Sequence, residues 1–209
     1  MEKTEQEKFW AGEFGTEYTG RNIGANILAS NIALFADIFK RQPKLNSVVE
    51  FGSNIGMNLR ALDLLRPDQE QIAVEINKIA AMRIYDALPN TKVFNLAISE
   101  FDPELLSNGP CDLALINGVL IHINPDQLKM VYEKLDKSSK KFILVCEYYN
   151  PKPDTVLYHG HADRLFRRDF AGELLDMYSD LKLINYGFAY HRDRLYPQDD
   201  LTWFLLEKL

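Results

Sequence analysis

From Asn46 onward, short apolar runs alternate along the chain with segments of helical periodicity. The runs are rich in Val, Ile and Leu and lack polar alternation, which is typical of strands buried on both faces. They occupy residues 47–51, 72–76, 91–96, 112–117 and 141–148. Between them lie helical segments such as 125–137, where Leu128, Val131 and Leu135 share one face. Strands that alternate with helices predict a parallel sheet with helices on both sides.

Two more strand-like runs close the chain, at residues 182–191 and 200–209, after a helical segment at 168–179. No helical segment separates these two runs, so they are expected to pair in the antiparallel sense. We therefore predict an α/β fold of the Rossmann-like kind. Its sheet is doubly wound, seven-stranded and mostly parallel, with an antiparallel C-terminal strand.

The segment before this sheet differs from it in composition. Residues 1–22 are polar, with aromatic residues and glycines interleaved, and residues 23–41 form a predicted helix. The apolar stripe of that helix consists of Leu28, Ile32, Phe35 and Phe39. A chain of 209 residues is typical of one domain. We predict residues 1–45 as an N-terminal helical lid and helix, and residues 46–209 as the core of the same structural domain.

Composition and charge argue against several classes of protein. The formal charge of −6 gives no basic field for gripping nucleic acid. Cys111 and Cys146 are too few for a disulfide framework and have no zinc-site spacing. No apolar run reaches the roughly 20 residues of a membrane span, and the polar N-terminus is not a secretory signal. We expect a monomer or homodimer of the reducing cytoplasm, without a metal, that binds neither nucleic acid nor membrane.

A glycine-containing turn follows the first predicted strand. Gly52 allows the backbone to turn sharply and approach a ligand, and Gly56 allows the next helix to start close to the strand. In such sheets, ligands bind beyond the carboxyl ends of the strands. The dinucleotide fingerprint would place glycines where Asn54 and Met57 stand, so a site that cradles a pyrophosphate is disfavoured.

An acidic residue, Glu75, ends the second predicted strand. A carboxylate at this position can accept hydrogen bonds from both hydroxyls of a ribose. Together with the glycine turn, Glu75 indicates a site for a nucleoside cofactor. The alternative is a simple turn glycine followed by a solvated glutamate.

These features resemble the class I S-adenosylmethionine-dependent methyltransferases. Their first motif is matched by Glu50, Gly52, Gly56 and Asn58, and their ribose-binding acid by Glu75. The resemblance implies S-adenosylmethionine as cofactor. It also implies that residues at the ends of the second, third and fourth strands contact this cofactor. The implied cofactor-binding residues of the core are Glu50, Gly52, Asn54, Gly56, Asn58, Glu75, Ile76, Ala97, Ile98, Asn117 and Gly118.

Methyltransferases of this class often cover the cofactor with a preceding helix or lid. Here the opening segment supplies Tyr18, Arg21 and Asn22, which are candidates to bind the methionine carboxylate of the cofactor or the substrate. Its aromatic residues supply apolar area, and its glycines give hinge-like freedom. The alternative is an aromatic staple that docks a frayed terminus.

A narrower resemblance spans nearly the whole chain. The segments FWAGEFGTEYTGRN, GVLIHINPDQL and YHGHADRLFRRDF look like the methylases associated with pseudaminic acid biosynthesis. Together with the two basic loops described below, this resemblance favours methyl transfer to a small acidic or nucleotide-activated sugar, with any other small carboxylate as an alternative. Two alternatives stay open: a nicotinamide-dependent oxidoreductase, and a non-catalytic nucleoside-binding partner of a biosynthetic complex.

Methyl transfer from a sulfonium requires the acceptor atom to be held in line with the methyl carbon. A hydroxyl acceptor also needs a base, whereas a carboxylate acceptor does not. The candidate catalytic residues at strand ends and in the following loop are His122, Glu147, His159 and His161. For His122 the alternative is a helix cap or a loop hydrogen bond.

Two basic loops that contain aromatic residues, 158–168 and 190–196, are expected on the ligand side of the sheet. Arginine forks suit carboxylate or phosphate groups, so the predicted substrate is a small acidic molecule. The candidate substrate-binding residues are Asn22, Tyr148, Tyr149, Arg164, Arg192 and Arg194. The alternative is surface charge that balances nearby acids, with tyrosines packed at the rim.

Overall fold

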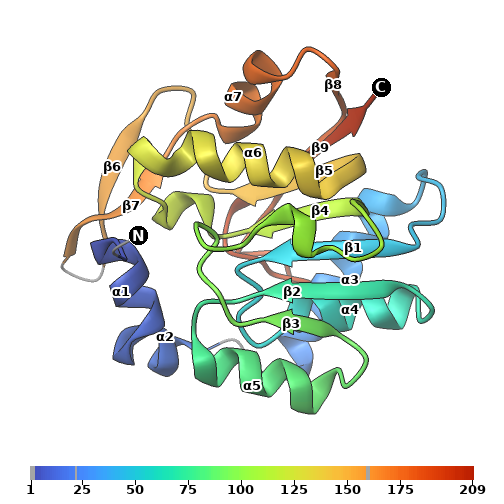
Figure 1. Cartoon of the computed structure of the whole chain (residues 1–209), viewed down its shortest axis with the longest axis horizontal. Coiled ribbons are helices and arrows are strands. Elements are labelled where there is room, and N and C mark those ends of the chain that lie inside the picture. The colour runs from blue at the N-terminus through green and yellow to red at the C-terminus, as the bar shows by residue number, and fades with distance from the viewer. Residues whose placement is uncertain (1–2, 22, 159–160) are drawn as a thin grey trace.

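A seven-stranded sheet in the order β3-β2-β1-β4-β5-β9-β8 runs through the centre of the molecule (Figure 1). The computed structural model describes residues 3–21, 23–158 and 161–209, without the side chains of 161–163. The strands of the sheet are β1 Ser47–Phe51, β2 Glu70–Val74, β3 Lys92–Phe94, β4 Cys111–Asn117, β5 Ser139–Glu147, β8 Leu181–Ala189 and β9 Leu201–Lys208.

The strand directions confirm the predicted sheet. β1 pairs in parallel with β2 and β4, and β5 continues the parallel set beside β4. β9 is antiparallel to both β5 and β8, so β8 runs in the same direction as the parallel strands. The carboxyl ends of β1 to β5 and of β8 therefore lie at one edge of the sheet.

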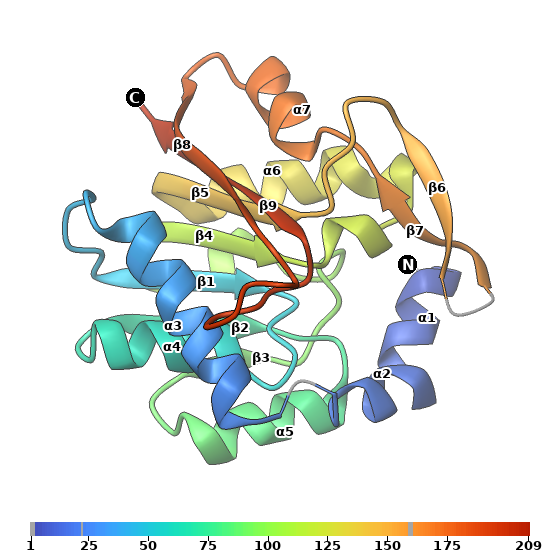
Figure 2. The ribbon, with the colours of Figure 1, turned by 180° about the vertical axis from the view of Figure 1, so that it is seen from behind.

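Helices cover both faces of the sheet and make a three-layer structure (Figures 1 and 2). One face carries α3 Ala25–Phe39, α4 Met57–Leu65 and α5 Lys78–Ala87, and the other carries α6 Leu128–Ser138 and α7 Phe170–Met177. In β1, Val48 faces the first set of helices and Val49 the second, and both side chains are fully buried. No helix among the described residues is long and apolar enough to cross a membrane.

The N-terminal segment is helical, as predicted. It forms α1 Glu5–Ala11 and α2 Glu13–Tyr18, in which Thr4 and Glu7 make a capping box at the start of α1. Both helices lie at the edge of the sheet where the parallel strands end, between α5 and a separate hairpin (Figures 1 and 2).

That hairpin consists of β6 Asp154–Tyr158 and β7 His161–Arg167, paired antiparallel. The sequence predicted a loop here, which is wrong for most of the segment. The charged residues of β7 hide its strand pattern, because only Leu165 and Phe166 among its described side chains are buried. Short 3₁₀ turns also occur, at Pro103–Leu105, Leu120–His122 and Pro125–Gln127, the last one at the start of the helix predicted for 125–137.

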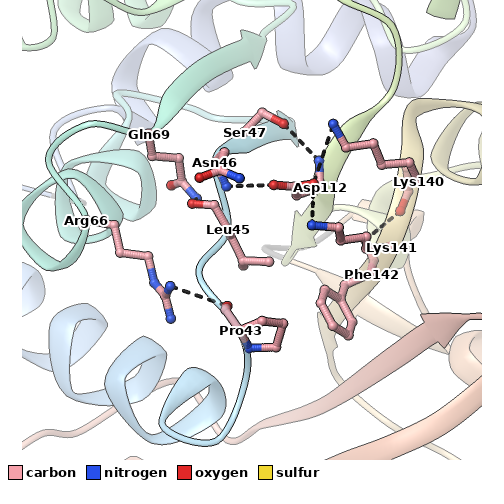
Figure 3. A network of polar contacts seen from close by, with 11 residues as sticks. Pro43, Leu45, Asn46, Ser47, Arg66, Gln69, Asp112, Lys140, Lys141 and Phe142 are labelled. Atoms are coloured by element: carbon pink, nitrogen blue, oxygen red, sulfur yellow. Dashed lines mark hydrogen bonds and ion pairs between the residues drawn. The ribbon is translucent and has the colours of Figure 1, made fainter.

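At the opposite edge of the sheet, Asp112 joins the amino ends of three strands (Figure 3). Its carboxylate accepts a hydrogen bond from the backbone N–H of Asn46 at 2.6 Å, and its Oδ1 lies 3.0 Å and 3.4 Å from the ammonium nitrogens of Lys141 and Lys140. Burial by itself would raise the pKa of Asp112, but the Asn46 hydrogen bond and the two lysines lower it overall. Asp112 therefore stabilises the fold in its ionised form.

Replacing Asp112 by Ala should lower the free energy of unfolding by about 1–3 kcal/mol, because the backbone N–H of Asn46 loses its acceptor and the two lysines lose the buried carboxylate beside them. Lys140→Ala is the matched control and should cost less than about 1 kcal/mol, since the lysine is half-exposed. The pKa of Asp112 is lower in the folded than in the unfolded protein. Its contribution to the free energy of unfolding is therefore fully present above the unfolded pKa of about 3.9, and is lost as the pH falls through the folded pKa. Urea unfolding at pH 7 and at pH 3 measures both effects, and equal losses at the two pH values would contradict the ionised role.

Candidate active site

The turn from β1 into α4 is tight and strained in a way that glycine permits. Gly52 and Gly56 have φ values of 74° and 77°, and Asn54 between them has a φ of 47°. A Cβ atom on Gly52 would lie 2.5 Å from a methyl carbon of Val119, so no larger residue fits there. The turn leaves the backbone N–H of Asn54 pointing to the end of β2, where it donates to Glu75.

Glu75 is buried and holds two loops at once. Its Oε2 accepts from the backbone N–H of Asn54 at 2.7 Å, and its Oε1 accepts from that of Asn77 at 2.7 Å. Burial raises the pKa of Glu75, while these two hydrogen bonds lower it. The carboxylate thereby fixes the glycine turn relative to the start of α5.

A cavity of about 130 Å³, here called the inner cavity, lies between these strand ends and the N-terminal helices. Its wall combines the carboxylate of Glu75 with a mainly apolar surface after β3. Residues that line it include Trp10, Gly52, Asn54, Glu75, Ile76, Leu96, Ala97, Ile98, Asn117, Gly118 and His122. Such a mixture of apolar surface and a few polar groups is typical of a small-molecule site.

A second cavity of about 460 Å³, here called the outer cavity, adjoins the first. Its wall combines apolar side chains with several amides and tyrosines. Its lining includes Tyr18, Arg21, Asn31, Asn58, Tyr148, Tyr158, Gln198 and Asp199. The two cavities share Tyr18, Gly52, Asn54, Asn117, Gly118 and His122. They therefore meet at the strand ends of β1 and β4, where a Cβ atom on Gly118 would find nothing within 4 Å.

His122 is buried in the wall that both cavities share. Its ring stacks obliquely on Trp10 and Tyr158, with centroids at 4.7 Å and 4.9 Å. Its Nδ1 lies 2.6 Å from the backbone oxygen of Arg164, which can only accept, so Nδ1 carries the proton and Nε2 keeps a lone pair. Burial lowers the pKa of His122 to about 4, against the weaker opposing effect of that hydrogen bond, so the ring is neutral at pH 7.

Glu50 and Gly56 belong to the glycine motif but do not line either cavity among the described residues. Asn58 donates to Oε1 of Glu50 at 2.7 Å, while Oε2 of Glu50 is buried without a hydrogen-bond partner among the described residues. Burial raises the pKa of Glu50 to about 8. Gly56 packs α4 against Ile84 of α5, where a Cβ atom would approach to 3.3 Å. Both residues thus support the site from behind, whereas a direct cofactor contact was expected.

Glu147 also differs from its expected catalytic placement. It is 2% exposed, and its Oε1 accepts from the backbone N–H groups of Val119 and Leu120 at 2.9 Å and 2.8 Å. Burial raises its pKa to about 8 despite these bonds. The carboxyl holds the turn that carries Gly118 and His122, and it does not line a cavity among the described residues.

The expected substrate-binding residues are only partly brought together. Tyr148 lines the outer cavity, but Tyr149 packs on Phe204 with centroids at 5.8 Å and is 43% exposed. The guanidinium of Arg164 lies over the ring of Phe9 at 5.6 Å. Arg192 and Arg194 are exposed in the β8–β9 loop, and none of these three arginines is among the cavity-lining residues. Asn22 and His159 lie outside the described residues, as does the side chain of His161.

Asn77 ties the N-terminal helices to the site. Its Nδ2 lies within hydrogen-bond distance of the backbone oxygens of Trp10 and Gly12, at 3.2 Å and 3.3 Å, and of the hydroxyl of Thr16 at 3.1 Å. Its Oδ1 caps α5 by accepting from the backbone N–H groups of Ile79 and Ala80. Because Asn77 also donates its own N–H to Glu75, the helices are coupled to the carboxylate of the inner cavity.

Structural comparison places this fold among methyltransferases. The 1,6-didemethyltoxoflavin-N1-methyltransferase of Burkholderia thailandensis, with S-adenosylhomocysteine bound, is 18% identical, with a TM-score of 0.67 over 93% of this chain and 84% of that chain. A methyltransferase of Leishmania major dependent on S-adenosylmethionine is 12% identical, with a TM-score of 0.69 over 97% and 80%. The magnesium protoporphyrin IX methyltransferase of Synechocystis PCC 6803, with S-adenosylmethionine bound, is 9% identical, with a TM-score of 0.66 over 100% of both.

No protein-family model matches the chain, and no curated protein matches its sequence. At these identities the structural likeness shows the fold alone. The chain has the Rossmann-like fold of the class I methyltransferases, as the resemblance in its glycine turn implied.

Substitution of Asn77 should separate its two roles. Asn77→Ser keeps an N-cap oxygen for α5 but is too short to reach the N-terminal helices, so residues 5–18 should be cleaved faster in limited proteolysis while global stability changes little. Asn77→Ala should show the same cleavage and lose about 1 kcal/mol of stability as well. Unchanged cleavage in both variants would show that other contacts hold these helices.

Proposed function

We propose that this protein is an S-adenosylmethionine-dependent methyltransferase that acts on a small molecule. The observation that carries the proposal is the position of Glu75. It lies beside a glycine turn and lines an inner cavity that opens at Gly118 and His122 into a larger outer cavity. A nucleoside could thus be bound in the inner cavity and a second substrate in the adjoining outer cavity.

The residues of the inner cavity fit the nucleoside half of this cofactor. Each oxygen of Glu75 uses one lone pair for a backbone N–H and keeps acceptor capacity for a ribose hydroxyl. The backbone and apolar side chains at Ala97 and Ile98 would hold the adenine, and Ile76 would pack beside it. The methionine half would extend past Asn117 and Gly118 toward Asn58, Tyr18 and Arg21.

S-adenosylmethionine, when bound, supplies an electrophilic methyl group on sulfur. The protein's contribution is to orient the acceptor against the shared wall and to exclude water, which α1 and α2 do by covering the inner cavity. His122 is the proposed base, because its neutral ring lines both cavities and its Nε2 can accept a proton from an acceptor hydroxyl or amine. Glu147 acts as a positioning residue through the turn that carries His122.

The geometry disfavours the nicotinamide alternative. A pyrophosphate at the glycine turn would need free backbone N–H donors there. The N–H of Asn54 instead donates to Glu75, and a phosphate placed there would meet a carboxylate. A non-catalytic nucleoside-binding role would give cofactor binding without methyl transfer.

A sugar-type acceptor is the narrower hypothesis, and it draws support from the amides and tyrosine hydroxyls of the outer cavity. Its predicted acidic character rested on Arg164, Arg192 and Arg194, which do not line that cavity. The link to pseudaminic acid biosynthesis remains a prediction, as do the monomer or homodimer and the division at residue 45. Incubation with methyl-labelled cofactor and a metabolite extract, followed by identification of the labelled product, tests the activity directly.

Calorimetry with S-adenosylhomocysteine should show binding to the wild type. Glu75→Gln should weaken it by roughly 10- to 100-fold, because a ribose hydroxyl and one backbone N–H lose a charged acceptor. Glu70→Gln, at the exposed start of the same strand, is the matched control and should leave affinity unchanged. Tighter binding of a nicotinamide dinucleotide than of S-adenosylhomocysteine would overturn the methyltransferase proposal.

If His122 is the base, the rate of methyl transfer should be flat above about pH 5 and should fall at lower pH. The sign follows from the pKa of His122, which is lowered from 6.5 to about 4, so the ring is neutral and able to accept a proton at higher pH. His122→Gln should reduce kcat by roughly 10²-fold. The pH profile is measured with the acceptor found in the extract, and an inflection near 6.5 or an unchanged kcat would remove His122 from this role.

A further inference from the structure

The outer cavity contains one positive and one negative side chain among its described lining residues, Arg21 and Asp199. Arg21 comes from the end of the N-terminal segment, and its guanidinium lies over the rings of Phe14 and Tyr18 at 5.7 Å from each. Asp199 comes from the β8–β9 loop, at the other end of the chain. The two charges are thus contributed by different walls of the cavity.

The loop that carries Asp199 is fixed to the core by a relay of amides. Gln198 donates from Nε2 to Asn31 of α3 at 3.0 Å, Asn31 donates to Asn58 of α4 at 2.8 Å, and Asn58 donates to Glu50 of β1 at 2.7 Å. The relay ends on the carboxyl of Glu50, which is buried in the core of the sheet. Gln198, and Asp199 next to it, are therefore held at the cavity although Asp199 is exposed.

The surroundings of Asp199 suit a cation. Tyr148 and Tyr158 line the same cavity, and Tyr18 lines it from the N-terminal helices. Burial is the largest cause of the raised pKa of Tyr148, and the negative charge of Asp199 is the second largest. The same charge contributes to the raised pKa of Tyr158, so the carboxylate acts on both phenols. Aromatic faces carry a negative potential that attracts an ammonium group and repels a carboxylate.

The methionine end of the cofactor in the proposed function carries a carboxylate, which needs donors, and an ammonium, for which backbone oxygens suffice. Its methionine carboxylate calls for Arg21, which is the cationic partner among the described lining residues. Asp199 then remains for the second substrate. This step rests on the proposed function.

We propose that the methyl acceptor carries a protonated amine, which binds Asp199 between the rings of Tyr148 and Tyr158. Asp199 is then the specificity-determining residue, and Gln198 with its amide relay is what positions it. This inference replaces the acidic substrate predicted from the loop arginines by a basic one.

The test uses the full chain saturated with S-adenosylhomocysteine, and two probes of matched shape and opposite charge, benzylamine and benzoate. Saturation-transfer NMR titrations should show tighter binding of benzylamine. Asp199→Asn should weaken benzylamine by about tenfold, the loss of one ion pair, and Asp199→Glu should restore the preference. Asp193→Asn is the matched control, because it removes the same charge from the same loop while its amide oxygen can still accept from Leu195 and Tyr196.

Benzoate binding that equals or exceeds benzylamine binding, no binding of either probe, or an unchanged preference in Asp199→Asn would each overturn the proposal. A loss of S-adenosylhomocysteine affinity in Asp199→Asn would also overturn it, because Asp199 would then serve the ammonium of the cofactor. Absence of S-adenosylhomocysteine binding to the wild type would instead overturn the proposed function, so the two failures are distinguishable.

Discussion

The hydrogen bonds to the carboxylate of Glu75 are the interaction on which the geometry of the site depends. One oxygen holds the glycine turn through Asn54, and the other holds the start of α5 through Asn77. Asn77 in turn holds the N-terminal helices. Burying a carboxylate is costly unless such donors compensate it. The same residue therefore forms the cavity, shapes the turn and, through one intermediate, positions the cover.

Much of the fold follows from local patterns in the sequence. The run 47–51 coincides with β1 and the run 112–117 lies within β4, because strands buried on both faces are largely apolar. The pairing of β8 with β9 follows from the absence of a helix between them. The β6–β7 hairpin was not predicted, because it lies outside the main sheet. Its exposed, charged residues do not give the apolar run that marks a buried strand.

The site was predictable where its residues are close in the chain or stand at strand ends. Gly52, Asn54 and Glu75 line the cavities, as their motif implied. The amide relay was not predictable, because Asn31 meets Asn58 and Gln198 across 27 and 167 positions. Asn, Gln and Asp in helices and polar loops carry no periodic signal that distinguishes a cavity wall from a solvated face.

The turns that follow β1 and β4 contribute backbone to the shared wall, and buried carboxyls fix that backbone from behind. Glu147 binds the N–H groups of Val119 and Leu120, and Glu75 binds that of Asn54. Because a peptide unit is planar and trans, the carbonyl of Gly118 must point away from Glu147 when the N–H of Val119 points toward it. At Gly118 this backbone carries no side chain and a Cβ atom would find nothing within 4 Å, whereas the side chain of Val119 packs against Gly52. The space is thereby left for a ligand, and its shape is set by buried carboxyls whose rotamers the core already restricts.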